Sequence, residues 1–195
     1  MKAACLVVAS LSLAVGCTPE FADDSQAPVL IRVSNITGTS GGGAGGGSGV
    51  GTVLNSDVSV DGSIFNDNAT LTVENIPKNQ NPDTIFGRIN DVVLERYEVR
   101  YVRSDGRDQE GVDVPFRITG PMAALVPVNG DVTVPITVVR HQAKSEAPLA
   151  NLRNGGGSFG ITTSARITIH GRTVSGKVVT TTGALQITFA DFADQ

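Results

Sequence analysis

The chain has 195 residues, a formal net charge of −4 and two cysteines, and 40% of its residues are hydrophobic. A mildly acidic surface repels phosphate backbones and anionic lipid headgroups, so this composition argues against nucleic-acid binding and against peripheral binding to membranes. Trp is absent and aromatic residues make up 5% of the chain, which argues against a carbohydrate-binding module that stacks sugars on exposed aromatic rings.

The first 16 residues predict a lipoprotein signal peptide. Lys2 supplies a positive charge, and the uncharged apolar run over residues 3–15 follows it. A transmembrane helix needs about 20 apolar residues, so this run is too short to span a bilayer and fits the core of a cleaved export signal. Cleavage before Cys17 would expose its thiol for lipidation. The expected location is therefore the bacterial cell envelope, with the protein anchored in a membrane.

Two features of the cleavage site leave alternatives open. Ala14 stands where bacterial lipoprotein signals usually have leucine, and the small residues Ala14 and Gly16 also suit an ordinary signal peptidase. Simple secretion therefore remains an alternative to lipidation of Cys17. Thr18, rather than an aspartate, follows the cysteine and favours the outer membrane or its periplasmic face.

Residues 17–27 are polar and predict a short tether, which leaves residues 28–195 for one folded domain. Alternating apolar residues predict a first strand near 29–34. The segment 38–51 holds nine glycines in fourteen residues and predicts a mobile loop, because its packing cannot offset the entropy lost on ordering. In the alternative, everything before Thr52 belongs to the tether.

The rest of the chain repeats short β-branched runs that are separated by turn residues, without a sustained helical period. Further strands are predicted at 53–60, 69–76, 91–103, 113–119, 123–128, 131–140, 161–170 and 176–190. Pro135 cannot donate to a strand ladder, so its strand is predicted at a sheet edge or bulge. Asn129-Gly130 is a strong hairpin signal. The predicted fold class is all-β, an antiparallel β-sandwich of the immunoglobulin-like or fibronectin-like kind.

No catalytic constellation emerges from the motifs. Ser40 and Ser158 match the Gly-x-Ser-x-Gly pattern of hydrolases, but neither serine is expected at a strand-to-helix turn. The glycines of 41–46 match a dinucleotide fingerprint without the βαβ unit that it requires. His141 and His170 are both predicted on outward faces, where they would be solvated imidazoles. We therefore expect a protein that is not an enzyme and binds no cofactor.

Oxygen-rich turns provide weak candidates for calcium ligands, since Ca²⁺ takes six to eight oxygens from flexible loops. The carboxylates concerned are Asp57, Asp61, Asp67, Asp105, Asp108 and Glu110. Their spacing matches no known calcium loop, and Asp, Asn and Gly are also the ordinary residues of turns. A calcium site is an alternative here, and the turn role is the simpler interpretation.

Three stretches carry a family resemblance. They are the strand and turn from Arg96 to Pro115, the segment from Arg140 to Leu152, and the C-terminal run from Phe189 to Asp194. Together they resemble uncharacterised bacterial lipoproteins that carry a signal peptide and a single immunoglobulin-like β-sandwich domain. The resemblance implies an address and a fold, and it brings no activity, cofactor or catalytic residue.

These observations predict an envelope-anchored lipoprotein that acts as a non-enzymatic structural or protein-interaction module. Its partners would be the membrane, through lipid on Cys17, and proteins of the envelope. The loops 104–111 and 141–157 are the expected contact surfaces, because a rigid sandwich presents its loops. Leu149 and Leu152 would give the second loop apolar surface to bury against a partner. The alternatives are a calcium- or small-ligand-binding sandwich and a subunit of an envelope complex.

Overall fold

The computed structural model describes residues 27–42, 52–79, 87–155 and 160–192, and within these ranges the chain is mostly β-strand. The strands are β1 (Val29–Thr39), β2 (Val53–Asp57), β3 (Asp67–Pro77), β4 (Val92–Arg103), β5 (Ile118–Val126), β6 (Asp131–Val139), β7 (Ile161–Thr173) and β8 (Val178–Ala190). The short helices are η2 (Arg88–Asn90), α1 (His141–Lys144) and η3 (Leu149–Gly155). The prediction of an all-β fold is confirmed. No helix within the described ranges has the length and apolarity to cross a bilayer.

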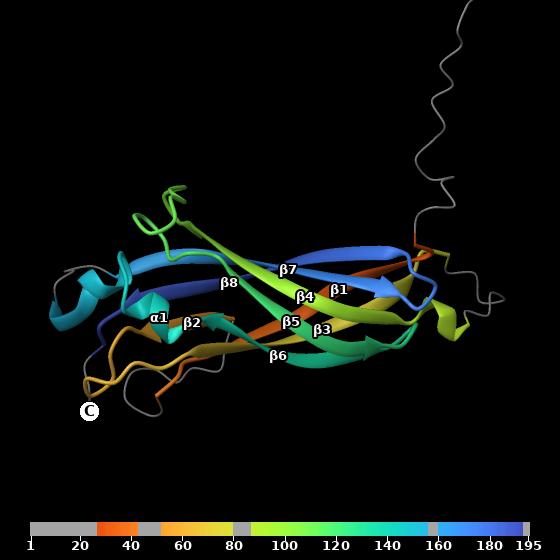
Figure 1. Cartoon of the computed structure of the whole chain (residues 1–195), viewed down its shortest axis with the longest axis horizontal. Coiled ribbons are helices and arrows are strands. Elements are labelled where there is room, and N and C mark those ends of the chain that lie inside the picture. Colours follow the sequence, from red (N-terminus) through yellow and green to blue (C-terminus); the bar gives the residue numbers. More distant parts are fainter. Residues whose placement is uncertain (1–26, 43–51, 80–86, 156–159, 193–195) are drawn as a thin grey trace, which may run out of the picture.

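The strands form two sheets that pack face to face. The smaller sheet has the order β1-β3-β6 and is antiparallel throughout. The larger sheet has the order β2-β8-β7-β4-β5, in which only the pairing of β2 with β8 is parallel. Along the flanks of the sandwich, β1 lies beside β8 and β5 lies beside β6 (Figure 1).

The core lies between the sheets and follows from alternation along each strand, because successive side chains point to opposite faces. On β7, Ile167 and Ile169 are fully buried, while Arg166, which precedes Ile167, points outward. Phe189 of β8 is fully buried and packs edge-on against Tyr101 of β4, with ring centroids 6.3 Å apart. Such an edge-to-face pair adds to the stabilisation gained from burial alone.

A buried hydrogen bond joins the two sheets at Tyr101. Its hydroxyl donates to the carbonyl oxygen of Val138 on β6, at 2.6 Å. Burial raises the pKa of the Tyr101 phenol far above its ordinary value, because the charged phenolate would lose its hydration. The phenol therefore remains protonated and keeps its donor role at any physiological pH.

Most predicted strands are confirmed. β1 extends to Thr39, so it includes the first two residues of the loop predicted at 38–51, and its pairing with β3 contradicts the alternative in which everything before Thr52 is tether; residues 43–51 lie outside the described ones. The region between β4 and β6 is corrected. Residues 113–117 form a loop, while 118–126 form the single strand β5 where two strands were predicted at 113–119 and 123–128. Val114 is nevertheless buried, because the loop itself folds onto the core. An apolar run inside a compact loop cannot be told from a strand by periodicity alone.

The turn at Asn129-Gly130 is present, but it does not make a hairpin. Asn129 adopts the left-handed conformation, with φ 57°, as this turn signal predicts. The two strands that it joins, β5 and β6, belong to different sheets. The turn carries the chain from one sheet to the other. Pro135 lies on β6, which is an edge strand of the smaller sheet, so the edge prediction is confirmed.

The sandwich is elongated, and different segments of the chain lie at its two ends (Figure 1). At one, here called the tether end, β1 begins and η2 lies against the β7–β8 turn, since the Ser175 amide donates to the Ile89 carbonyl at 2.9 Å. At the other, here called the loop end, lie the loop 104–117 and the segment 140–155. The described chain begins at Ala27, so any tether enters at the end opposite these loops.

Candidate functional site

The loop 104–117 and the segment 140–155 meet at the loop end; they contain the described parts of the predicted contact loops 104–111 and 141–157, but the cavity lining includes no residue of 104–111. A shallow cavity of about 90 Å³ lies between them. Its lining comes from both loops and the adjoining strand, and consists of Phe116, Arg117, Ile118, Arg140, Gln142, Ala143 and Glu146. The fold thus joins segments that are some two dozen residues apart into one surface, here called the loop-end surface and defined as Val112, Phe116, Arg117, Arg140 and Glu146.

The loop-end surface combines exposed apolar side chains with charged ones. Val112 is 59% exposed and Phe116 is 54% exposed. Arg117 forms ion pairs with Glu110 at 2.9 Å and with Glu98 at 3.8 Å, and Arg140 donates to the Thr119 carbonyl at 3.0 Å. Interface cores favour aromatic residues and arginine. An exposed Phe that lines the same cavity as two anchored arginines therefore has the composition of a protein-contact surface.

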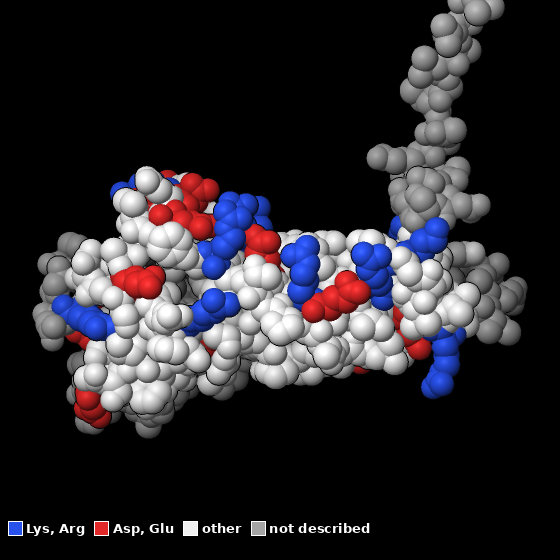
Figure 2. Space-filling view, in the orientation of Figure 1, with Lys and Arg blue, Asp and Glu red and all other residues white. Residues whose placement is uncertain are grey.

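Asp105 orders the turn at the start of the loop 104–117. Arg107 reaches it at 2.7 Å and Arg103 reaches it at 3.4 Å. The side-chain hydrogen bond from Arg107, with a second one from its backbone amide, lowers the pKa of the Asp105 carboxyl. Gly106 completes the turn with φ +87°, a conformation that favours glycine. In Figure 2, red and blue side chains are mixed over this loop.

The segment 140–155 differs from its expected role. Leu149 is fully buried and Leu152 is 6% exposed, and both belong to the core of the sandwich. The expectation that they would be buried against a partner is wrong, because the loop folds back and the chain buries them itself. The residues of this segment that line the cavity at the loop end are Arg140, Gln142, Ala143 and Glu146.

A buried ion pair fastens this segment to the sandwich. Lys144 Nζ donates to Asp67 Oδ1 at 2.9 Å, and the two side chains are 1% and 0% exposed. The same carboxylate accepts the Ser56 hydroxyl at 2.5 Å and the Gly41 amide at 2.8 Å. Removing a charge from water is costly, and these three donors offset the cost for Asp67. The cluster joins α1, β2, β3 and the residues that follow β1.

This cluster was missed by sequence reasoning. Lys144 and Asp67 lie 77 residues apart, and nothing in the local pattern around either residue marks it as buried. Lysine is almost never fully buried unless it is paired, so a solvated lysine was the reasonable expectation. Asp67 itself was considered only as a calcium candidate, and the structure instead places a lysine against it.

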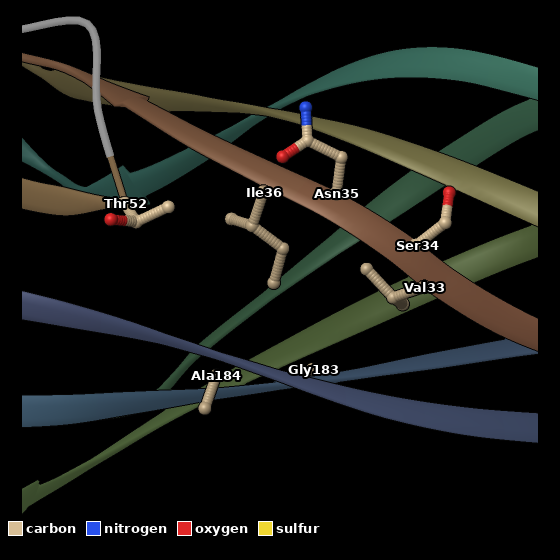
Figure 3. A pocket seen from close by; sticks show the side chains of 7 residues that line it. All are labelled: Val33, Ser34, Asn35, Ile36, Thr52, Gly183 and Ala184. Atoms are coloured by element: carbon tan, nitrogen blue, oxygen red, sulfur yellow. The ribbon is translucent and has the colours of Figure 1, made fainter.

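A second cavity, of about 270 Å³, follows the seam between β1 and β8 (Figure 3). Val33 and Ile36 both point into it from β1, because the register shift between Val33 and Asn35 interrupts the alternation. Gly183 on β8 makes room for them, since a Cβ there would lie 2.6 Å from Ile36 Cδ1. The remaining lining residues are Ser34, Asn35, Thr52 and Ala184, so the lining carries no charged group.

The calcium candidates occupy different environments. Asp57 is buried and accepts the backbone amides of Ser59 and Phe192, Asp61 lies exposed in a turn with φ 48°, and Asp67 belongs to the buried ion pair. Asp105 and Glu110 pair with arginines, and Asp108 is exposed. Within the described residues, no three His, Cys, Asp or Glu gather closely enough to hold a metal ion. The calcium hypothesis stays a prediction.

The residues of the rejected catalytic motifs make different contacts. The His141 ring and backbone amide both face the Asn66 side-chain oxygen, at 3.1 and 2.6 Å, whereas His170 pairs with Arg96 in the ladder of the larger sheet. Ser40 follows β1, and its hydroxyl contacts the Gly41 carbonyl at 3.4 Å. Ser158 and Cys17 lie outside the described residues.

Comparison with known proteins adds little to this geometry. No protein-family model matches the chain, and no curated protein matches it at a significant level. One solved structure, described as "X-ray structure of Northeast Structural Genomics Consortium target SoR45", aligns over 82% of this chain and 86% of its own chain, with 8% sequence identity and a TM-score of 0.38.

Proposed function

We propose that this protein is a lipid-anchored module of the bacterial envelope that binds a protein partner through its loop-end surface and catalyses no reaction. The observation that carries the proposal is that the chain enters the sandwich at one end and the loop-end surface lies at the other. The chain enters the sandwich at the tether end, about 40 Å from the loop end if β7, with its 13 residues, is taken as the measure. An anchor on Cys17 would thus hold the loop-end surface away from the membrane.

We further propose that the sandwich is of the immunoglobulin-like type. In that fold, strand B pairs with A and E in one sheet, and strand F pairs with C and G in the other. The order β1-β3-β6 corresponds to A-B-E, and the order β8-β7-β4 corresponds to G-F-C, with β5 as an added C′ strand. The chain has no Trp and the mature protein would keep a single cysteine, so the Trp and the disulfide of antibody domains have no counterpart here, and the buried pair of Tyr101 with Phe189 is the aromatic contact that joins β4 to β8.

The choice of the loop-end surface as contact site depends on which apolar groups are still available. Leu149 and Leu152 are buried within the protein itself, whereas Val112 and Phe116 are more than half exposed. Ion pairs hold Arg117, so it would lose little conformational freedom when a partner binds, and preorganisation of this kind favours affinity.

The anchor is tested on the mature N-terminus. We expect mass spectrometry of the mature protein to give Cys17 as the first residue, carrying acyl chains, and fractionation to recover the protein with membranes, because two or more acyl chains anchor stably. The Cys17→Ala variant is expected to move to the soluble or secreted fraction. An unmodified Cys17 in the wild-type protein would contradict the anchor and favour simple secretion.

The contact surface is tested in intact cells by site-specific photocrosslinking. A photoreactive amino acid at Phe116 is expected to give one discrete protein adduct, and the Arg117→Glu substitution is expected to abolish it because it reverses the charge beside the probe. The same probe at Thr182, an exposed position on the larger sheet, is the matched control. Equal adducts from both positions, or none from Phe116, would argue against the loop-end surface.

A further inference from the structure

The tether end carries a second apolar surface that the proposed function does not use. Its members are Ile89 and Val178, each 61% exposed, Val174 at 57%, Leu125 at 53% and Val93 at 40%. Single exposed apolar residues are ordinary, but a contiguous group of them marks a contact surface. These five residues are called the tether-end patch.

The strand register places three members of the patch in one row, in which Arg172 lies between Val93 and Val178. Val93 of β4 is directly opposite Leu125 of β5 on one side and Arg172 of β7 on the other. Arg172 is in turn opposite Val178 of β8. Residues directly opposite in a ladder share a face, so the row crosses four strands on the outer face of the larger sheet.

The remaining two members extend this row onto the tip of the molecule. The Ser175 amide donates to the Ile89 carbonyl at 2.9 Å, and the Val174 amide donates to the Asp91 carbonyl at 2.8 Å. These bonds hold η2 against the β7–β8 turn. Ile89 and Val174 therefore project from one ordered tip.

Positive charges lie near the patch. Arg88 is exposed beside Ile89, Lys177 lies next to Val178, and Lys78 follows β3 at the same end. Among the described carboxylates nearby, Asp91 is buried and accepts the Val128 amide at 2.9 Å, Glu95 is paired with Arg172 at 3.5 Å, and Asp131 begins β6. Figure 2 shows blue side chains at this end of the molecule. A surface that combines exposed apolar side chains with nearby lysine and arginine has the composition that binds the interface of an anionic bilayer.

The chain outside the described residues determines which surface can meet this patch. Residues 18–27 would join lipidated Cys17 to the body, and ten extended residues reach at most about 35 Å. The tether end would therefore always remain within that distance of the bilayer. A protein partner in solution or a second copy would have to compete with a lipid surface that the anchor keeps close at all times.

We propose that the tether-end patch inserts into the headgroup region of the membrane that holds the protein, so that the body docks on the bilayer with the loop-end surface pointing outward. A cavity of about 250 Å³ between the starts of β1 and β8, lined in part by Leu30, Lys78 and Val178, adds apolar surface at the same end. This inference rests on the proposed lipid anchor. It adds a second contact, which limits the rotation of the body on its tether.

The test uses the mature lipidated protein in vesicles of phosphatidylethanolamine and phosphatidylglycerol that contain a lipid-borne spin-label quencher. Acylation would consume the thiol of Cys17, so an introduced cysteine is the only one available for a fluorophore. The label is placed at Ser175→Cys on the tip or at Asp108→Cys at the loop end, both exposed positions. We expect quenching at position 175 and none at position 108.

The patch is then altered without disturbing the core. Replacing Val174 and Val178 together by serine is expected to abolish quenching at position 175, while flotation shows that the lipid still anchors the protein. Val53→Ser, which changes an exposed valine on β2 that belongs to neither proposed contact surface, is the control and is expected to leave quenching unchanged.

Flotation and quenching together distinguish a failure of the docking inference from a failure of the anchor. A protein that floats with the vesicles but shows no quenching at position 175 would overturn the docking inference and leave the anchor intact, and it would assign the patch to a protein partner or a second copy. A protein that does not float would overturn the anchor itself, and the docking inference with it.

Discussion

Replacing Lys144 with methionine is expected to lower the free energy of unfolding by about 3–5 kcal/mol, the usual cost of breaking a buried pair. Methionine fills a similar volume but leaves the Asp67 carboxylate buried without its cation, with only the Ser56 hydroxyl and the Gly41 amide to stabilise it. For a domain of this size the melting temperature should fall by about 6–20 °C. Urea unfolding followed by circular dichroism measures the effect.

Two further variants separate the lost charge pair from a general loss of packing. The double variant Lys144→Met with Asp67→Leu is expected to recover much of the stability, because replacing both partners of a buried pair by apolar groups is often nearly neutral. Arg32→Met removes a cation from the solvent-exposed pair of Arg32 with Glu74 and should change the unfolding midpoint little. A Lys144→Met protein as stable as the wild type would refute a structural role for the pair.

The ion pair of Lys144 with Asp67 also supports the proposed contact surface. It fastens the segment that contributes Gln142 and Glu146 to the cavity at the loop end. Amide hydrogen exchange over 141–153 should therefore accelerate in Lys144→Met, even under conditions in which the rest of the sandwich remains folded, because the local opening of this segment becomes easier.

The Gly120→Ala substitution is expected to cost about 1–3 kcal/mol, the range for adding a methyl group to a packed site. Gly120 on β5 is directly opposite Tyr97 on β4, and a Cβ there would lie 2.6 Å from the Tyr97 hydroxyl oxygen. The Tyr97 ring, which is 7% exposed, covers the bare backbone of the glycine. A methyl group would displace that ring from the core, and denaturant unfolding measures the resulting loss.

Gly87→Ala provides the matched control. Gly87 has φ −75°, and among the described residues a Cβ there would approach only Ile89 Cγ1, at 3.8 Å. Alanine should therefore fit without strain and change stability by less than about 1 kcal/mol, in the stabilising direction. Combining Gly120→Ala with Tyr97→Leu should cost less than the sum of the two single changes, since the smaller side chain leaves room for the methyl group. Additive effects would show that the two residues do not interact.

Periodicity in the sequence was sufficient for most of the strands, for the sandwich class and for the edge position of Pro135. These features depend on local information, because alternation of apolar residues and the missing amide of proline act on neighbouring residues. The same reasoning failed at 113–119, where Val114 is buried by a folded loop, and at Leu149 and Leu152, which the chain buries itself. A local pattern indicates that a residue will be buried and does not indicate by what.

By itself, the sequence determined an all-β chain of alternating strands behind a predicted export signal, because those properties lie in contiguous residues. Tertiary structure alone decided three things: the burial of Lys144 against Asp67, the union of two loops at one end, and the convergence of Ile89, Val93 and Val178 at the other. Net charge argues against peripheral binding to membranes, and the docking proposed at the tether end rests instead on a local group of side chains. Binding depends on the charged and apolar side chains that the fold brings together at one place on the surface. Composition and net charge average over the whole chain and do not show where these side chains gather.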